Sequence, residues 1–121
     1  MLLKDFYSVI KSTQNEEEFT SVIKINKEHP LYKGHFPDRP VTPGVILMQL
    51  FKEEAERRCK CELQLETASN VKFMAVVDPN SCDLLTLQST ISADGGIFKL
   101  KGIAKQNDTI SLKISATYLS V

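Results

Sequence analysis

One long helical segment in a chain that otherwise consists of predicted strands is the feature that most constrains this fold. Thr42-Pro43-Gly44 opens the helix, because threonine can act as a cap and proline tolerates the first helical position, where its missing N–H would have no partner. The helix is predicted to end at about Cys59. Residues 45–51 are apolar on every side apart from Gln49, which predicts that this part is buried all round. Residues 52–58 are strongly charged, so this end of the helix is expected to leave the core and reach water.

The segment before the helix predicts a β-hairpin followed by a loop. Phe6 to Thr13 and Glu18 to Asn26 are partly alternating stretches on either side of Gln14-Asn15-Glu16-Glu17, a turn sequence. The apolar residues between positions 2 and 10 would also suit a short helix. From Glu28 to Pro40, three prolines, a glycine and both histidines exclude regular structure, so this stretch is expected to be a loop.

Four strands are predicted after the helix, as an antiparallel meander. They span Thr67–Val77, Cys82–Ser92, Ile97–Gln106 and Thr109–Leu119. In the last of them apolar residues alternate with serine, threonine and lysine, the pattern of a sheet with one buried face. Because a single long helix is available to cover that face, the sequence predicts an α+β hot-dog fold, a curved antiparallel sheet wrapped around one buried helix. The whole chain, residues 1–121, is expected to form one domain.

Composition argues against several classes of partner and site. Lysine plus arginine number 15 and aspartate plus glutamate number 15, so no net field would attract nucleic acid or an anionic membrane. No apolar run approaches the ~18 residues of a membrane span, and acids follow the N-terminus too early for a secretory signal, so a cytoplasmic location is expected. Cys59, Cys61 and Cys82 suit neither a redox pair nor the usual zinc spacing, and no second cluster of ligands accompanies His29 and His35. No metal or cofactor is therefore expected.

The segment Gly34-His35-Phe36-Pro37-Asp38-Arg39-Pro40-Val41-Thr42-Pro43-Gly44-Val45 resembles the central motif of the FabZ and FabA family of 3-hydroxyacyl-carrier-protein dehydratases. That motif reads roughly GHFPxxPxxPGV, and every fixed position is met. Val71-Lys72-Phe73, followed by Pro79, also resembles the family's strand after the helix. The resemblance implies dehydration of a 3-hydroxyacyl thioester, linked to an acyl carrier protein or to CoA, in fatty-acid or related lipid or polyene synthesis. It also implies a homodimer or higher homo-oligomer, in which each site is built from two protomers.

Elimination of water from such a thioester requires three groups: a base for the Cα proton, a stabiliser for charge on the thioester oxygen, and an acid for the departing hydroxyl. His35 can supply the base, since the unperturbed pKa of an imidazole is about 6.5. In the alternative interpretation, His35 is a hydrogen-bonded loop histidine. Gly44 and Val45 fall in the first turn of the helix, where backbone N–H groups lack intrahelical partners and can bind the carbonyl. The resemblance implies that the Gly44 amide polarises the thioester carbonyl. In the alternative interpretation, Pro43-Gly44 serves only to start the helix.

The acid position departs from the family's pattern. The family has glutamate or aspartate where this chain has Gln49, and commonly glutamine where this chain has Glu53. Glutamine cannot donate a labile proton. Glu53 lies on the same helix face, one turn or ~5–6 Å further on, so water or Gln49 would have to bridge the gap. Glu53 is equally well interpreted as a solvated residue in a charged helix end.

Three functions stay open on the sequence. For a dehydratase, the acyl chain needs an apolar tunnel, and the candidate residues, each equally suited to the core, are Phe36, Val45, Met48 and Phe73. A second possibility, favoured by Gln49, is a subunit that has lost its acid and binds acyl thioesters or supports an active partner. A hot-dog thioesterase is the third, for which hydrolysis needs a carboxylate to activate water.

Overall fold

The computed structural model describes residues 5–34 and 41–121. Within these ranges the elements, in chain order, are β1 (Tyr7–Asn15), β2 (Glu18–Ile25), α1 (Leu31–Gly34), α2 (Gly44–Cys59), β3 (Leu63–Phe73), β4 (Leu84–Asp94), β5 (Ile97–Gln106) and β6 (Thr109–Ser120). Strand and helix ranges agree with the predicted hairpin, the long helix and the last three strands. No helix in the described part of the chain has both the length and the apolar character that crossing a membrane requires.

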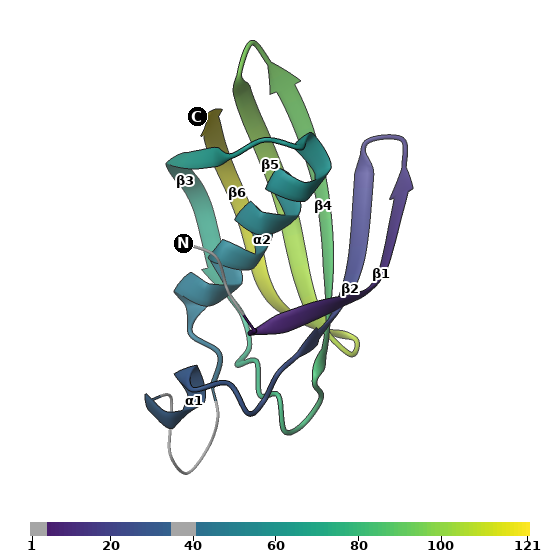
Figure 1. Cartoon of the computed structure of the whole chain (residues 1–121), viewed down its shortest axis with the longest axis vertical. Helices are drawn as coiled ribbons and strands as arrows, with labels where there is room; N and C mark the ends of the chain where they lie inside the picture. Colours follow the sequence, from purple (N-terminus) through teal and green to yellow (C-terminus); the bar gives the residue numbers. More distant parts are fainter. Residues whose placement is uncertain (1–4, 35–40) are drawn as a thin grey trace.

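The described strands form one antiparallel sheet in the order β1-β2-β4-β5-β6-β3, and α2 lies against its concave face (Figure 1). This is the predicted α+β hot-dog arrangement. The predicted four-strand meander is wrong for its first strand, because β3 pairs with β6, from Leu63 opposite Ser120 to Phe73 opposite Leu112. The reason is that β2 of the hairpin occupies the free edge of β4, so β3 must take the far edge of the sheet.

Strand β3 also begins four residues earlier than predicted. Helix α2 ends at Cys59, and its C-cap Lys60 adopts a left-handed conformation with φ of 56° and donates its backbone N–H to the Glu56 carbonyl. The Glu56 carboxylate then accepts the backbone N–H of Leu63 at 2.9 Å. These two contacts turn the chain so sharply that it enters the sheet almost at once, and the strand is complete at Phe73.

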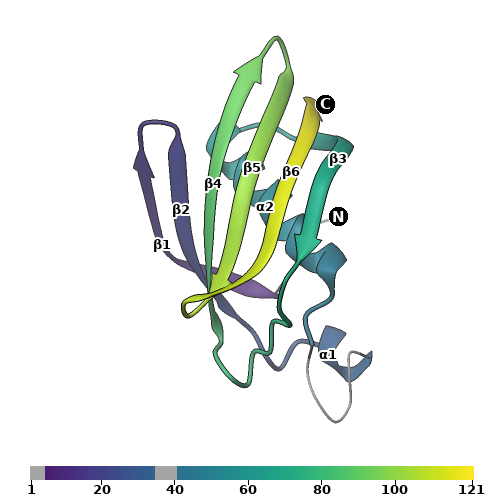
Figure 2. The ribbon, with the colours of Figure 1, turned by 180° about the vertical axis from the view of Figure 1, so that it is seen from behind.

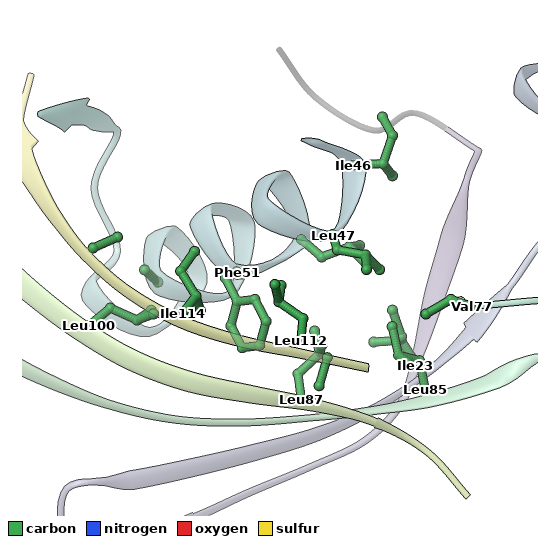
Figure 3. Close-up of a cluster of buried hydrophobic side chains, with 14 of the residues drawn as sticks. Ile23, Ile46, Leu47, Phe51, Val77, Leu85, Leu87, Leu100, Leu112 and Ile114 are labelled. Carbon is green, nitrogen blue, oxygen red and sulfur yellow. The ribbon is translucent and has the colours of Figure 1, made fainter. Parts of the chain in front are cut away.

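The core lies between the inner face of the sheet and one side of α2. Figure 3 shows Leu47 and Phe51 of α2 among strand side chains that include Leu87 and Leu112. In β6 the predicted alternation is confirmed, since its buried apolar residues are Leu112, Ile114, Ala116 and Tyr118. Figure 2 shows the opposite, convex face of the sheet, with α2 behind it.

Two expectations about the ends of α2 are wrong. Its first turns are not buried all round, because Val45 is 71% exposed while Leu47 and Leu50 are buried. Its charged end does not leave the core, since Glu53 and Glu54 are only 8% and 0% exposed. The hydroxyl of Tyr7, on the edge strand β1, reaches this end of the helix and gives the charged residues partners there.

The loop before α2 also differs from expectation. Thr42 does not cap the helix: Pro43 occupies the N-cap, and the Thr42 hydroxyl instead hydrogen-bonds the Tyr32 hydroxyl at 2.8 Å in a buried position. The segment predicted to be irregular contains the single helical turn α1. The backbone N–H of Leu31 donates to Nδ1 of His29 at 3.1 Å, which supports the start of that turn.

The packing of α2 on β5 depends on a glycine, and Gly102→Ala is expected to destabilise the fold. An added Cβ would lie 2.5 Å from Cε1 of Phe51, a ring that is 0% exposed. Overpacking of this kind costs typically about 1–3 kcal/mol, which urea unfolding would measure. Gly34→Ala is the matched control, because no described residue lies within 4 Å of its added Cβ. Equal stability of both variants would contradict this account of the core.

Candidate active site

The motif ends at the N-terminus of α2, where the backbone offers unpaired donors. The first intrahelical hydrogen bonds run from the amides of Ile46 and Leu47 to the Pro43 carbonyl, at 3.0 and 3.3 Å. The amides of Gly44 and Val45 precede these donors, so they lie at the positive end of the helix dipole with no acceptor in their own helix. Such a terminus suits a carbonyl oxygen that gains negative charge.

Gly44 also makes room for Phe73. A Cβ on Gly44 would lie 2.5 and 2.6 Å from Cε1 and Cζ of the Phe73 ring. The ring is 57% exposed, so Phe73 is not a core residue. A hollow of about 400 Å³ opens at this point, and its lining includes Gly44, Leu47 and Phe73. The two predicted site residues Gly44 and Phe73 are therefore brought together.

A second, smaller hollow lies between α2 and the strands β3 and β6. It has a volume of about 220 Å³ and is lined by Val45, Met48, Gln49, Lys52, Leu65 and Tyr118. Val45, Met48 and Gln49 were each singled out from the sequence, and the structure places all three around this one space. The Tyr118 side chain at the hollow is 2% exposed, and burial raises its pKa to about 12. The Tyr118 hydroxyl, which lines the hollow, therefore stays uncharged at physiological pH.

Glu53 is a buried member of a polar network that reaches the surface at Arg57. Its Oε1 accepts the Tyr7 hydroxyl at 3.0 Å and its Oε2 accepts Nε2 of Gln49 at 3.1 Å. The Tyr7 hydroxyl in turn accepts a hydrogen bond from Nη1 of Arg57 at 2.6 Å. The interpretation of Glu53 as a solvated residue is therefore wrong. Gln49 and Glu53 are directly bonded to each other, so an intervening water is not needed to connect them.

Neighbouring charges complete this network. Arg57 forms an ion pair with the fully buried Glu54, and its guanidinium lies 5.6 Å from the centre of the Tyr7 ring. Burial raises the pKa of Tyr7, although the nearby Arg57 opposes this shift. Tyr7 therefore keeps its proton at neutral pH and donates it to the carboxylate.

Sequence reasoning missed Tyr7 and Arg57. The i, i+4 spacing of Glu53 and Arg57 on one helix face was available as a signal. No local pattern connects Tyr7 with Glu53, which follows it by 46 positions. His35 and Phe36, both predicted to serve the site, lie outside the described residues. The three cysteines are free thiols, and residues 5–34 and 41–121 hold no cluster of three or more His, Cys, Asp or Glu side chains suited to a metal ion.

Comparison with known proteins gives one family and a group of relatives. A family model described as ApeI dehydratase, ApeI-like, matches residues 11–113. A 3-hydroxyacyl-[acyl-carrier-protein] dehydratase FabZ from a Thermoanaerobacter species is 33% identical over 95 residues, 72% of this chain and 66% of that protein. The FabZ of Coxiella burnetii is 26% identical over 111 residues, 83% of this chain and 77% of the relative. A Caulobacter FabZ is 29% identical over 92 residues, and the match spans only 55% of its length.

Solved structures share the fold at low sequence identity. The dehydratase heterocomplex ApeI:P from Xenorhabdus doucetiae superimposes with a TM-score of 0.74 at 17% identity, covering 93% of this chain and 96% of that one. A hypothetical thioesterase with coenzyme A from Streptococcus pneumoniae gives 0.66 at 11% identity, covering 95% and 85%. These likenesses show that the hot-dog fold is shared.

Proposed function

We propose that this chain, which belongs to the ApeI-like family of dehydratases, removes water from a 3-hydroxyacyl thioester and forms a 2-enoyl thioester. One observation carries the proposal: the dehydratase-like motif ends where the unpaired amides at the start of α2 adjoin two hollows with apolar walls. An acyl thioester needs both features, a donor for its carbonyl and an apolar space for its chain. The relatives named as acyl-carrier-protein dehydratases support the same substrate class.

The thioester carbonyl is held by the amides of Gly44 and Val45. Removal of the Cα proton places negative charge on the carbonyl oxygen, and two N–H donors at a helix N-terminus stabilise that charge more than they stabilise the neutral ground state. Val41 and Phe73 line the hollow beside Gly44 and shield this end of the ligand from water. The acyl chain lies against Val45 and Met48, with Phe36 as a further contact.

The proton transfers centre on His35. Its imidazole takes the Cα proton, the electron pair of that C–H bond forms the new double bond, and the C–O bond at C3 breaks with its electrons leaving on oxygen. Gln49 has no labile proton to give, and the Glu53 carboxylate is occupied by Tyr7 and Gln49. The proton that completes the departing water is therefore the one that His35 removed, and the imidazole is regenerated neutral.

A second copy of the chain covers the open edge of the sheet. Strand β3 is an edge strand, and apolar side chains around it and on α2 are 43–71% exposed, namely Val45, Leu65, Phe73, Met74 and Val76. Exposed apolar groups beside an unpaired edge are a liability unless a partner covers them. Acyl carrier protein or CoA is the carrier of the substrate in this proposal.

The protein is therefore expected to be a homodimer, or a larger homo-oligomer, in solution. Light scattering coupled to gel filtration at micromolar concentration would give a mass of two or more copies. Val76→Lys, which places a charge in the exposed apolar group, is expected to shift the mass toward one copy. A wild-type protein that stays monomeric at working concentration would contradict the dimer.

A second function is favoured by Gln49 together with one structural relative. The solved ApeI:P complex is described as a heterocomplex, so a chain with an amide in the acid position could act as the supporting subunit of a mixed dimer. The thioesterase function has support from the fold alone. Mass spectrometry of the products distinguishes the three candidate functions. Loss of one water from the thioester indicates dehydration, a free acid indicates hydrolysis, and unchanged substrate indicates a supporting subunit.

A further inference from the structure

We propose that the convex face of the sheet is a docking surface for an anionic lipid bilayer, which it binds through outward-pointing lysine side chains. Figure 2 shows this face, with α2 on the other side of the sheet. The inference goes beyond the proposed function, because it concerns where the protein is held and not which reaction it performs. Composition could not reveal such a surface, since a net charge of zero describes the whole chain and not its separate faces.

Strand register determines which side chains point away from α2. Directly paired residues on neighbouring strands share a face, and successive residues along a strand alternate between the two faces. In β5, Leu100 and Ala104 are buried on the inner face, so the lysines that alternate with them point outward. The same pairing continues across the sheet to the other strands. The outward lysines are Lys11, Lys24, Lys72, Lys99, Lys101, Lys105 and Lys113.

Four of these lysines, Lys72, Lys101, Lys105 and Lys113, form a compact lysine cluster on β3, β5 and β6. Lys113 lies directly opposite Lys72 on one side. On its other side Lys113 pairs with Ile103 of β5, and Lys101 and Lys105 flank that partner along the strand. Like charges directly opposite each other on neighbouring strands destabilise a sheet. An anionic surface above the lysine cluster would relieve this repulsion.

The lysine cluster has no acidic partner among the residues that the structure describes. Lys24, further along the sheet, does have one, since its Nζ lies 4.0 Å from the Asp83 carboxylate. The other ion pairs of residues 5–34 and 41–121 lie within α2. Strand pairing places the acids Glu18 and Asp94 on the convex face, at one end of β2 and of β4. Lysines therefore outnumber acids on this face, and its charge is positive.

A hollow of about 380 Å³ lies on this face beside the lysine cluster. Its lining includes Lys101 and Lys113, together with Glu18. The uncharged polar side chains that pairing turns toward the same side are those of Asn70, Gln88, Thr90 and Ser115. A phospholipid headgroup offers a phosphate to the ammonium groups and ester oxygens to hydroxyl and amide donors. The hollow thus suits a headgroup better than it suits an apolar ligand.

The residue types of the convex face favour a bilayer over other anionic partners. The described strand residues that pairing turns outward include neither an arginine nor an aromatic ring. Single-stranded nucleic acid is bound by stacking on aromatic rings, and tight protein interfaces centre on tyrosine, tryptophan and arginine. A convex sheet also does not enter a groove of duplex DNA, as a helix does. Separate lysine ammonium groups are sufficient for attraction to anionic lipid headgroups.

Binding through this face gives the protein one orientation at the membrane surface. The convex face lies on the bilayer, and α2 on the concave face points to water (Figure 1). The hollow lined by Gly44 and Phe73 lies at the start of α2, so it stays accessible to a ligand from the water side. Docking and catalysis therefore use different faces of the sheet and can be tested separately.

The test is co-sedimentation of the full-length chain with lipid vesicles. Vesicles of phosphatidylcholine with about one-third phosphatidylglycerol are expected to bind the protein, and pure phosphatidylcholine vesicles are not. Binding should be lost at about 1 M salt, where the screening length falls to about 3 Å. The double variant Lys72→Gln with Lys113→Gln should bind roughly 10- to 30-fold more weakly, because each lysine near the surface contributes about 5-fold.

Lys27→Gln with Lys33→Gln is the matched control, since it removes the same charge from exposed positions outside the sheet and should bind as the wild type does. Equal weakening in the two double variants would overturn the assignment to the convex face. Absence of wild-type binding to anionic vesicles at low salt, or binding that resists salt, would overturn the proposal. Tighter binding of a single-stranded oligonucleotide than of anionic vesicles would replace the bilayer with nucleic acid. None of these measurements depends on turnover, so their failure is distinct from failure of the proposed function.

Discussion

Replacement of His35 by alanine is expected to abolish measurable formation of the 2-enoyl thioester while the protein stays folded. The loss should be roughly 10²- to 10⁴-fold, the usual size for a positioned general base. In the proposed reaction the imidazole handles the transferred proton twice, once from Cα and once toward the departing hydroxyl. A loop histidine that serves chemistry should contribute little to the core, so the unfolding midpoint is expected to stay close to that of the wild type.

The other histidine supplies the control for this variant. His29 accepts the Leu31 amide through Nδ1, and asparagine can offer an oxygen in a similar place, so His29→Asn should keep near-normal turnover. Unchanged turnover in His35→Ala would remove His35 from the mechanism. An unfolded His35→Ala protein beside a folded His29→Asn protein would favour the structural interpretation of His35.

Gln49→Glu is expected to raise turnover by roughly 10²-fold, because it places an acid at the position where the sequence resemblance implies that the family has one. The Gln49 nitrogen now lies 3.1 Å from Oε2 of Glu53, so a carboxyl group in its place would meet a second carboxyl group. Two carboxylates this close cannot both ionise, and one of them keeps a proton near neutral pH. That proton can be given to the leaving hydroxyl. The plot of kcat against pH should gain a descending limb at alkaline pH, where the proton is lost.

The same chemical change elsewhere tests whether the effect is local. Gln64→Glu, at an exposed position on β3, should leave turnover unchanged. The double variant Gln49→Glu with Glu53→Gln gives the order that the resemblance implies for the family and should also exceed the wild type. No rise in either variant, with the fold intact, would show that the missing acid does not limit the rate. If no variant turns over, the supporting-subunit function becomes the better one, and a second hot-dog subunit should be sought.

Local signals were sufficient for the elements that carry the motif. Helix α2 ends at Cys59 as predicted and begins at Gly44, one residue later than predicted, because proline, glycine and the apolar run act within a few residues of each other. The bounds of β5, Ile97–Gln106, were also predicted from its turn residues. The pairing of β3 with β6 could not be read in the same way, since it depends on which sheet edge β2 has already taken.

Burial on α2 was harder to predict because side-chain type does not say what covers a residue. Val45 is apolar but exposed, since an apolar pattern is the same for a core and for a surface that meets a partner. Glu53 and Glu54 are charged but buried, since their partners Tyr7 and Arg57 lie across the fold or on the next turn. Val45, Met48 and Gln49 were singled out from the sequence for different reasons, and their i, i+3 and i+4 spacing on α2 brings them to one hollow.

The most direct test of the central claim is incubation of the purified full-length chain with a 3-hydroxyacyl thioester, on pantetheine, CoA and acyl carrier protein in turn. Formation of the conjugated enoyl thioester is followed by its ultraviolet absorbance. The account predicts a steady rise in this absorbance that depends on protein concentration and is absent with the His35→Ala variant. No rise with any of the three carriers, from a protein shown to be folded and oligomeric, would contradict the claim that this chain by itself dehydrates 3-hydroxyacyl thioesters.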